Sequence, residues 1–131
     1  MVPIDVTQKA IKVLFSDDSS IIRKHLHTLL SDLSDIKVIG ESDTVSETIE
    51  RVSTLLPDVV ILDIHMPDGN GIQALRYIKA AHPEIKVIML TNHANPFYRE
   101  ACLQAGASYF LDKSTEFETI GSVLTQLTEQ A

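Results

Sequence analysis

The sequence predicts an α/β fold, namely a doubly wound parallel sheet of five strands with helices on both faces. Two observations carry this prediction. Short runs rich in β-branched residues alternate along the chain with segments whose apolar residues recur at helical spacing. Capping and turn residues stand at the boundaries between them. Regular alternation of this kind favours parallel strands buried on both faces, and the doubly wound order 2-1-3-4-5 accommodates five strands.

The predicted strands are short and mostly apolar. The chain has no internal repeat and no linker rich in Pro, Gly or Ser. Residues 11–131 are therefore expected to form one domain after a short lead at residues 1–10. The predicted strands lie at 11–16, 36–40, 58–63, 85–91 and 107–111.

The predicted helices are delimited by capping and breaking residues. An apolar stripe from Ile22 to Leu33 marks the first helix. Thr44 and Glu47 form a capping-box pattern that opens the second helix, which Pro57 closes. Gly69 and Gly71 precede the third helix, which stops before Pro83. The fourth runs from Asn95–Pro96 to Gly106, and the fifth from Glu116 to about Gln130.

Composition narrows the class of protein. The chain has 131 residues, of which 44% are hydrophobic and 22% charged, as in ordinary soluble domains. The net charge of −7 argues against direct binding of this domain to nucleic acid or to an anionic membrane. No apolar run approaches the roughly 20 residues that span a bilayer, and the start lacks a signal-peptide pattern. The single cysteine, Cys102, excludes an internal disulfide. A cytoplasmic protein is expected.

Carboxylates stand at the ends of two predicted strands. Asp17 and Asp18 follow strand 11–16, and Asp63 ends strand 58–63. In the order 2-1-3-4-5 these two strands are neighbours at the switch point, so the three carboxylates are expected to meet. Like charges held this close repel one another, and carboxylate oxygens suit a hard cation. The sequence therefore predicts a site for Mg²⁺ or a similar ion at the carboxyl end of the sheet.

Two more polar residues stand at the same predicted edge. Thr91 ends strand 85–91, and Lys113 follows strand 107–111. An aspartate carboxylate can act as a nucleophile in aspartyl-phosphate chemistry. If Asp63 attacks a phosphoryl group, the ammonium of Lys113 and the hydroxyl of Thr91 could bind the remaining phosphoryl oxygens.

These five polar residues, in this order and at these strand ends, resemble the receiver domain of two-component response regulators, a flavodoxin-like fold. The resemblance covers about residues 11–128. Met66–Pro67 with Gly69 and Gly71 looks like the family's loop after the phosphoacceptor, and Gly106–Ala107 looks like its approach to the last strand.

The resemblance implies a role for each residue. Asp63 would be the phosphoacceptor. Asp18 would bind Mg²⁺ directly together with Asp63, and Asp17 would help through water or by orientation. The backbone carbonyl of His65 would be a further metal ligand.

The other roles concern the phosphoryl group and the response to it. Lys113 would pair with the phosphoryl group, and Thr91 would hydrogen-bond it and move towards it. Phe110 occupies the position of the family's switch aromatic, three residues before the lysine, whereas Tyr109 lies one place too early.

Some positions depart from the usual family pattern. Ser114 follows Lys113 where a proline is common, so a trans peptide and a looser loop are expected. His65 and His93 occupy positions that overlook the phosphorylation site in this family, and Asn92 replaces a small residue. We hypothesise that these three residues set the rate of autodephosphorylation.

The resemblance also implies partners. A sensor histidine kinase or a phosphotransfer protein would supply the phosphoryl group. The switched surface, residues 95–130, would contact an output domain, a target protein or a second copy of the chain. Residues 110–114, which lack proline, favour regulators with a helix-turn-helix output domain. The sequence leaves open whether the receiver acts alone or within a longer protein.

Two other functions remain as alternatives. A phosphorylation-independent adaptor could keep the fold, but the intact set of five polar residues argues against it. A Mg²⁺-dependent phosphatase of the haloacid-dehalogenase type also uses an aspartate nucleophile. Such enzymes carry a second acid two residues later, and His65 stands there instead. The expected chemistry is therefore limited to self-phosphorylation and its hydrolysis, without turnover of other substrates.

Overall fold

The computed structural model describes residues 10–129, with side chains up to Leu127. The predicted lead, residues 1–10, falls outside this range except for Ala10. None of the helices within 10–129 is both long and apolar enough to cross a membrane.

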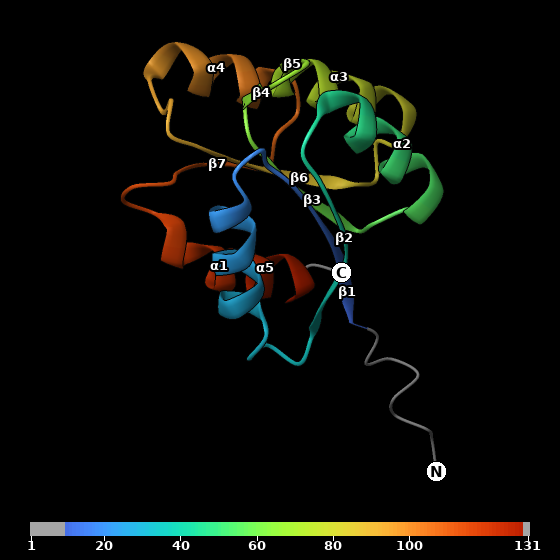
Figure 1. The fold of residues 1–131 in the computed structure, drawn as a ribbon, viewed down its shortest axis with the longest axis vertical. Helices are drawn as coiled ribbons and strands as arrows, with labels where there is room; N and C mark the ends of the chain where they lie inside the picture. The colour runs from blue at the N-terminus through green and yellow to red at the C-terminus, as the bar shows by residue number, and fades with distance from the viewer. Residues whose placement is uncertain (1–9, 130–131) are drawn as a thin grey trace.

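The central sheet has five parallel strands in the order β2-β1-β3-β6-β7 (Figure 1). Counted along the chain as principal strands, this is the predicted order 2-1-3-4-5, so the doubly wound, flavodoxin-like prediction is confirmed. The strand bounds differ from the predicted ones by one or two residues. The strands are β1 (Ile11–Ser16), β2 (Ile36–Ser42), β3 (Val59–Leu62), β6 (Lys86–Thr91) and β7 (Tyr109–Asp112).

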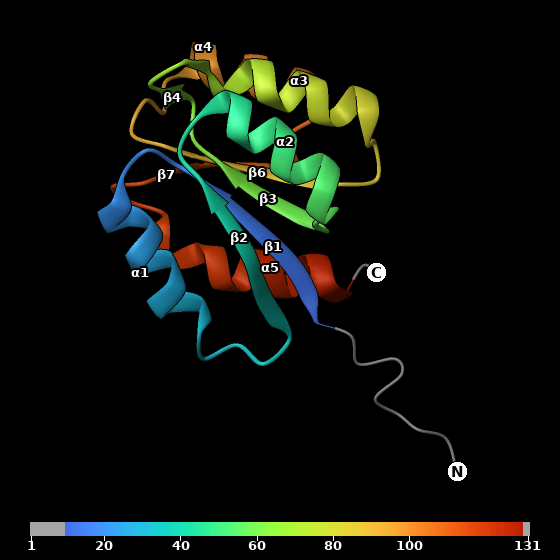
Figure 2. The ribbon, with the colours of Figure 1, turned by 45° about the vertical axis from the view of Figure 1, so that its right-hand side comes forward.

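Helices cover both faces of the sheet, as Figure 2 shows. Helices α1 and α5 lie on one face, and α2, α3 and α4 lie on the other. The five predicted helices are all present, but the prediction for the last one began too early, because residues Phe117–Thr119 form a separate 3₁₀ turn, η2. The helices are α1 (Ser20–Leu30), α2 (Val45–Leu55), α3 (Gly71–Ala81), α4 (Pro96–Gln104) and α5 (Ile120–Glu129).

The alternation of side chains along each strand builds two cores. In β1, Leu14 belongs to the cluster under α2–α4, whereas Val13 and Phe15 belong to the cluster under α1 and α5. Complete burial of such a side chain stabilises the fold by about 1.5–3 kcal/mol. Cys102 lies buried in the first cluster, and burial raises the pKa of its thiol to about 11, which favours a packing role over thiol chemistry.

Local chemistry explains where the helices begin and end. Thr44 caps α2, since its hydroxyl accepts a hydrogen bond from the backbone N–H of Glu47 at 3.0 Å. The predicted capping box is only half formed there, because the Glu47 carboxylate accepts from the N–H of Asp43 instead. A complete capping box opens α3 at Asn70. Gly106, with φ of 107°, ends α4 in a conformation that favours glycine.

One element has no counterpart in the prediction. After β3, strands β4 (His65–Met66) and β5 (Gly69–Asn70) pair as a short antiparallel ribbon. The Asp68 carboxylate, in the turn between them, accepts hydrogen bonds from two N–H groups at the start of α2, those of Val45 at 2.7 Å and Ser46 at 3.0 Å. These hydrogen bonds hold the loop after Asp63 against the start of α2.

At the amino ends of β6 and β7, a lysine makes contacts of a different kind. The Lys79 ammonium, near the end of α3, donates to the carbonyls of Pro83 and Ile85, each at 2.8 Å. Its aliphatic chain covers Gly106, which precedes β7. These contacts join the end of α3 to the start of β6 and the approach to β7.

Candidate functional site

The sheet itself delivers the acidic residues to one place. Beyond the end of β1, the N–H of Asp17 donates to the carbonyl of Ser42 at 3.0 Å. Beyond the end of β3, the N–H of Asp63 donates to the carbonyl of Ser16 at 2.9 Å. Because these hydrogen bonds continue the ladders between neighbouring strands, the positions of both aspartates depend on the backbone of the sheet.

Lys113 bridges two of the carboxylates. Its ammonium lies 2.7 Å from Asp17 Oδ2 and 3.0 Å from Asp63 Oδ2. All three side chains are buried, with exposed fractions of 6%, 4% and 7% for Lys113, Asp17 and Asp63. Solvent therefore screens this charge network only weakly.

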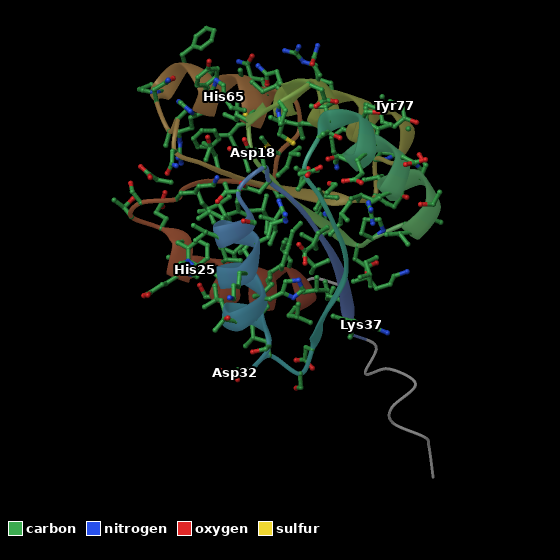
Figure 3. The ribbon with its side chains drawn as sticks, viewed as in Figure 1. Asp18, His25, Asp32, Lys37, His65 and Tyr77 are labelled. Carbon is green, nitrogen blue, oxygen red and sulfur yellow. The ribbon has the colours of Figure 1, made fainter. Side chains whose placement is uncertain are left out.

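Backbone N–H groups hold the other oxygens of both carboxylates. Asp17 Oδ1 accepts from Ser19 N at 2.9 Å, and Asp63 Oδ1 accepts from Ile64 N at 2.7 Å. Asp18, in contrast, projects from the same turn into solvent and is exposed. Figure 3 shows it at the end of β1. The site thus combines two fixed carboxylates with one that is open to water.

Burial and pairing shift the ionisation of the site. Burial raises the pKa of Asp17 above its usual range, although the hydrogen bond from Lys113 opposes the rise. Burial would lower the pKa of Lys113, but its pairing with Asp17 and Asp63 outweighs that effect and raises the pKa. The ammonium is therefore held in its charged form by its two partners.

The donor set fits a hard divalent cation. Asp17, Asp18 and Asp63 each offer a carboxylate oxygen, and these oxygens lie within 4.8 Å of one another. Three carboxylates face one ammonium, so negative charge remains in excess. All-oxygen ligands of this kind suit Mg²⁺, which usually keeps several waters and takes few protein carboxylates. The exposed side of Asp18 leaves room for those waters.

Thr91 lies at the end of β6 and is completely buried. Its hydroxyl oxygen accepts a hydrogen bond from His93 N at 3.0 Å, and its carbonyl accepts from Lys113 N, also at 3.0 Å. The threonine is therefore joined through its backbone to the residue that pairs with Asp63.

The two aromatic residues of β7 point to opposite faces of the sheet. Phe110 is buried in the cluster under α2–α4, with the Arg99 guanidinium 5.9 Å from its ring centroid. Tyr109 packs with the other cluster and donates its hydroxyl to Gln126 Oε1 at 3.1 Å. Phe110, the switch aromatic expected from the resemblance, thus lies on the face of the sheet that α4 covers.

The three residues expected to set the rate of autodephosphorylation are all exposed, at the rim of the acidic site. His65 begins β4, and Asn92 and His93 follow β6. The two imidazole rings are in contact, with centroids 3.9 Å apart. Figure 3 places His65 beside α4.

Hydrogen bonds hold the loop at Lys113 and Ser114, where the sequence lacks the proline that is common in the family. Among residues 10–129 no peptide bond is cis, so this one is trans. Asp112 Oδ1 accepts from both the N–H and the hydroxyl of Ser114, at 2.8 and 2.6 Å. The N–H of Asp112 in turn donates to Glu116 Oε1 at 2.9 Å. The trans peptide expected there is thus confirmed, and the looser loop stays a prediction.

Two further residues support the site through contacts that the sequence did not predict. Gly71 was expected only in the loop after Asp63, before the third helix, and Arg23 was not singled out. Gly71 packs so closely against the residue that follows β3 that a Cβ atom would lie 1.8 Å from the carbonyl oxygen of Asp63. Arg23, on α1, donates from Nη1 to the carbonyl of Asp17 at 2.6 Å and from Nε to Glu41 at 2.9 Å. Neither contact leaves a pattern in the sequence, since each joins a helix to a strand end through the fold.

Comparisons with known proteins agree with this geometry. The family model of the response regulator receiver domain matches residues 13–125. The chain is 35% identical over 103 residues to the response regulator GacA of Pseudomonas syringae, which covers 79% of this chain and 48% of that protein. It is 36% identical over 116 residues to the response regulator protein VraR of Staphylococcus saprophyticus, which covers 87% of this chain and 54% of that protein. The chain thus spans about half the length of these relatives.

Solved structures show the same fold. The signal receiver domain of the response regulator NarL from Mycobacterium tuberculosis superposes with a TM-score of 0.83 at 29% identity, covering 94% of this chain and 99% of that one. The response regulator domain of Thermotoga maritima CheB superposes with a TM-score of 0.81 at 32% identity, covering 94% and 96%. With its fold and its acidic site, the chain belongs to the family of response regulator receiver domains.

Proposed function

We propose that this receiver accepts a phosphoryl group on Asp63 from the phosphohistidine of a sensor kinase or a phosphotransfer protein. The observation that carries the proposal is the bridging ammonium of Lys113, 3.0 Å from Asp63 Oδ2 within a cluster of carboxylates. In the transfer, an Asp63 oxygen forms a bond to phosphorus while the bond from phosphorus to the donor imidazole nitrogen breaks. The imidazole leaves with the electron pair and is protonated by solvent.

The other residues of the site would bind and neutralise the reacting groups. Asp17, Asp18, Asp63 and the backbone carbonyl of His65 would hold Mg²⁺, which when bound supplies positive charge to the phosphoryl oxygens. Lys113 would move its pairing from the Asp63 carboxylate to the phosphoryl group.

Phosphorylation would then act on the surface formed by residues 95–130. The added charge would draw the hydroxyl of Thr91 away from His93 N and towards the phosphoryl group. Displacement of Thr91 would change the packing of Phe110 beneath α4. This surface would contact an output domain, a target protein or a second copy of the chain. Relatives of about twice this length support an output domain outside residues 11–131.

The proposed chemistry ends with hydrolysis of the phosphoaspartate, so the domain turns over no other substrate. His65, Asn92 and His93 stand exposed at the rim, where they would control access of water to the phosphoryl group. A cytoplasmic location would follow from this function, because kinases phosphorylated from a nucleotide supply the phosphoryl donor there.

Intact mass spectrometry tests the proposal directly. Incubation with Mg²⁺ and acetyl phosphate should add one phosphoryl group to the wild-type protein. Asp63→Asn should take up none, and neither should the wild type in excess chelator. If no adduct forms and a beryllofluoride complex cannot be detected either, the domain is an adaptor and the proposal fails. Release of phosphate from small esters over many turnovers would instead favour the phosphatase.

A further inference from the structure

Two exposed imidazoles stand together at the rim of the site. His65 begins β4 and His93 follows β6, and their ring centroids lie 3.9 Å apart with the planes tilted by 48°. Within residues 10–129 this is the one contact between two histidine rings. From this pair we propose a second cation site, at which His65 and His93 jointly bind a transition-metal ion of the Zn²⁺, Ni²⁺ or Cu²⁺ class.

The chemistry of the donors separates this site from the acidic one. Imidazole nitrogen suits Zn²⁺, Ni²⁺ and Cu²⁺, whereas carboxylate, carbonyl and water oxygens suit Mg²⁺. The two sites are adjacent, since His65 lies two residues after Asp63, but they select different ions. Millimolar Mg²⁺ fills the acidic site without competing for the imidazoles.

The two rings are already placed close together. His65 is held by the pairing of β4 with β5, opposite Asn70. His93 is held by the hydrogen bond from its N–H to Thr91. The ring of Tyr98 meets the His65 ring edge-on, with centroids 5.9 Å apart and planes at 86°. The backbone contacts of both residues, and Tyr98 at the His65 ring, therefore keep the two imidazoles side by side.

The ring nitrogens are available to a ligand. Across the described part of the chain, no side chain or carbonyl hydrogen-bonds a ring nitrogen of His65 or His93. His27 differs, because its Nε2 is engaged by the Glu41 carboxylate. Both rim histidines are exposed, so water can complete the coordination of an ion. The excess negative charge of the neighbouring acidic site also favours a cation here.

A bound ion would join the segment after β3 to the segment after Thr91. One ligand lies in the loop after β3, and the other lies in the loop that carries Thr91 towards α4. Cross-linking them should slow any displacement of Thr91 and hence phosphoryl uptake. This consequence rests on the proposed function, whereas metal binding itself does not.

Calorimetric titration of the untagged protein with NiCl₂, in excess Mg²⁺, tests the site. We expect one Ni²⁺ per chain with a dissociation constant on the order of micromolar. His65→Ala and His93→Ala should each weaken binding by about tenfold or more, since each removes one of two ligands. His25→Ala is the matched control, because His25 is an exposed histidine on α1, well apart from His65 in Figure 3. It should bind as the wild type does.

Two results would overturn the site. Undiminished binding of Ni²⁺ by either His65→Ala or His93→Ala would place the ion elsewhere. Absence of saturable binding by the wild type below about 1 mM would show that the histidine pair does not chelate the ion. The phosphorylation assay with acetyl phosphate, repeated with and without Ni²⁺, is scored separately. Failure of the wild type to form an adduct in Mg²⁺ alone would count against the proposed function and leave the binding result intact.

Discussion

At the residue scale, the charge balance of the site depends on Lys113. Its ammonium is the one cation that contacts the buried carboxylates of Asp17 and Asp63 among the residues described. Removing one partner of a buried charge network leaves the others unpaired and desolvated, which costs about 3–5 kcal/mol. The lysine thus stabilises the protein even before any phosphoryl group arrives.

Lys113→Met should therefore lower the free energy of unfolding by about 3 kcal/mol at neutral pH, measured by urea denaturation. Because pairing raises the pKa of Lys113, its contribution is complete below the unfolded value near 10.5 and is lost as pH rises through the folded value. The difference between wild type and variant should accordingly shrink in strong alkali. Lys24→Met, on the exposed face of α1, is the control and should change little.

The rim histidines make a second prediction at this scale. If they set the rate of autodephosphorylation, His65→Ala and His93→Ala should each change the half-life of the phosphorylated protein. The half-life is read from the decay of the phosphorylated mass after removal of the donor. Unchanged half-lives in both variants would contradict the hypothesis that these histidines set the rate.

At the element scale, the start of α3 lies in close contact with Asp63, at the end of β3. Alanine normally favours a helix over glycine by about 1 kcal/mol. At Gly71, however, a Cβ would lie 1.8 Å from the carbonyl oxygen of Asp63, so backbone must move. Helix propensity and steric contact therefore act in opposite directions.

Gly71→Ala should lower the midpoint of thermal unfolding and, by displacing Asp63, slow phosphorylation. Gly121→Ala provides the matched comparison in α5, where the nearest atom to the added Cβ is Leu33 Cδ1 at 3.6 Å, an ordinary contact. That change should raise stability by up to about 1 kcal/mol. Equal effects of the two substitutions on unfolding would contradict the steric argument.

The contact between α1 and β2 depends on a carboxylate. Glu41 binds Arg23, which in turn holds the carbonyl of Asp17, and it also contacts His27. Burial opposes ionisation of Glu41, but its hydrogen bonds to His27 and Arg23 outweigh that and lower its pKa. Its contribution should thus be present above pH 4.5 and fade as pH falls through the lower folded value.

Glu41→Gln should destabilise the protein by about 1 kcal/mol or less at pH 7, since the carboxylate is partly exposed. The deficit should disappear in acid, as followed by thermal unfolding between pH 7 and pH 3. Glu50→Gln, an exposed residue of α2, is the control. A deficit that does not depend on pH would assign the effect to packing rather than to charge.

The elements differ in how far sequence could predict them. The principal strands were predictable because each lies in a short apolar run, and the site was predictable because parallel strands present their carboxyl ends together. The β4–β5 ribbon was not, since strands of two residues show no periodicity. Asp68 was also missed, because it caps a helix 22 and 23 residues away. Lys113 was expected to meet phosphate, and only the folded arrangement showed that it bridges Asp17 and Asp63.

At the scale of the whole molecule, metal binding should couple to folding. An ion that binds only the folded site stabilises it by mass action, by about 2.7 kcal/mol at one hundred times the dissociation constant. Relief of repulsion among Asp17, Asp18 and Asp63 is the physical source of this gain.

Mg²⁺ should therefore raise the midpoint of thermal unfolding of chelator-treated protein, and Asp18→Asn should remove most of the shift. Asp32→Asn alters an exposed acid distant from Asp18, as Figure 3 shows, and should keep the full shift. If both variants respond as the wild type does, Mg²⁺ acts outside the acidic site.

The Lys79 contacts join the end of α3 to the two strands that end in Thr91 and Asp112. They anchor the approach to β6 and to β7 at the side remote from the carboxylates. At their opposite ends these strands finish at Thr91 and Asp112. Any shift in the position of the end of α3 should therefore be passed to β6 and β7 together, from the side of the sheet opposite the acidic site.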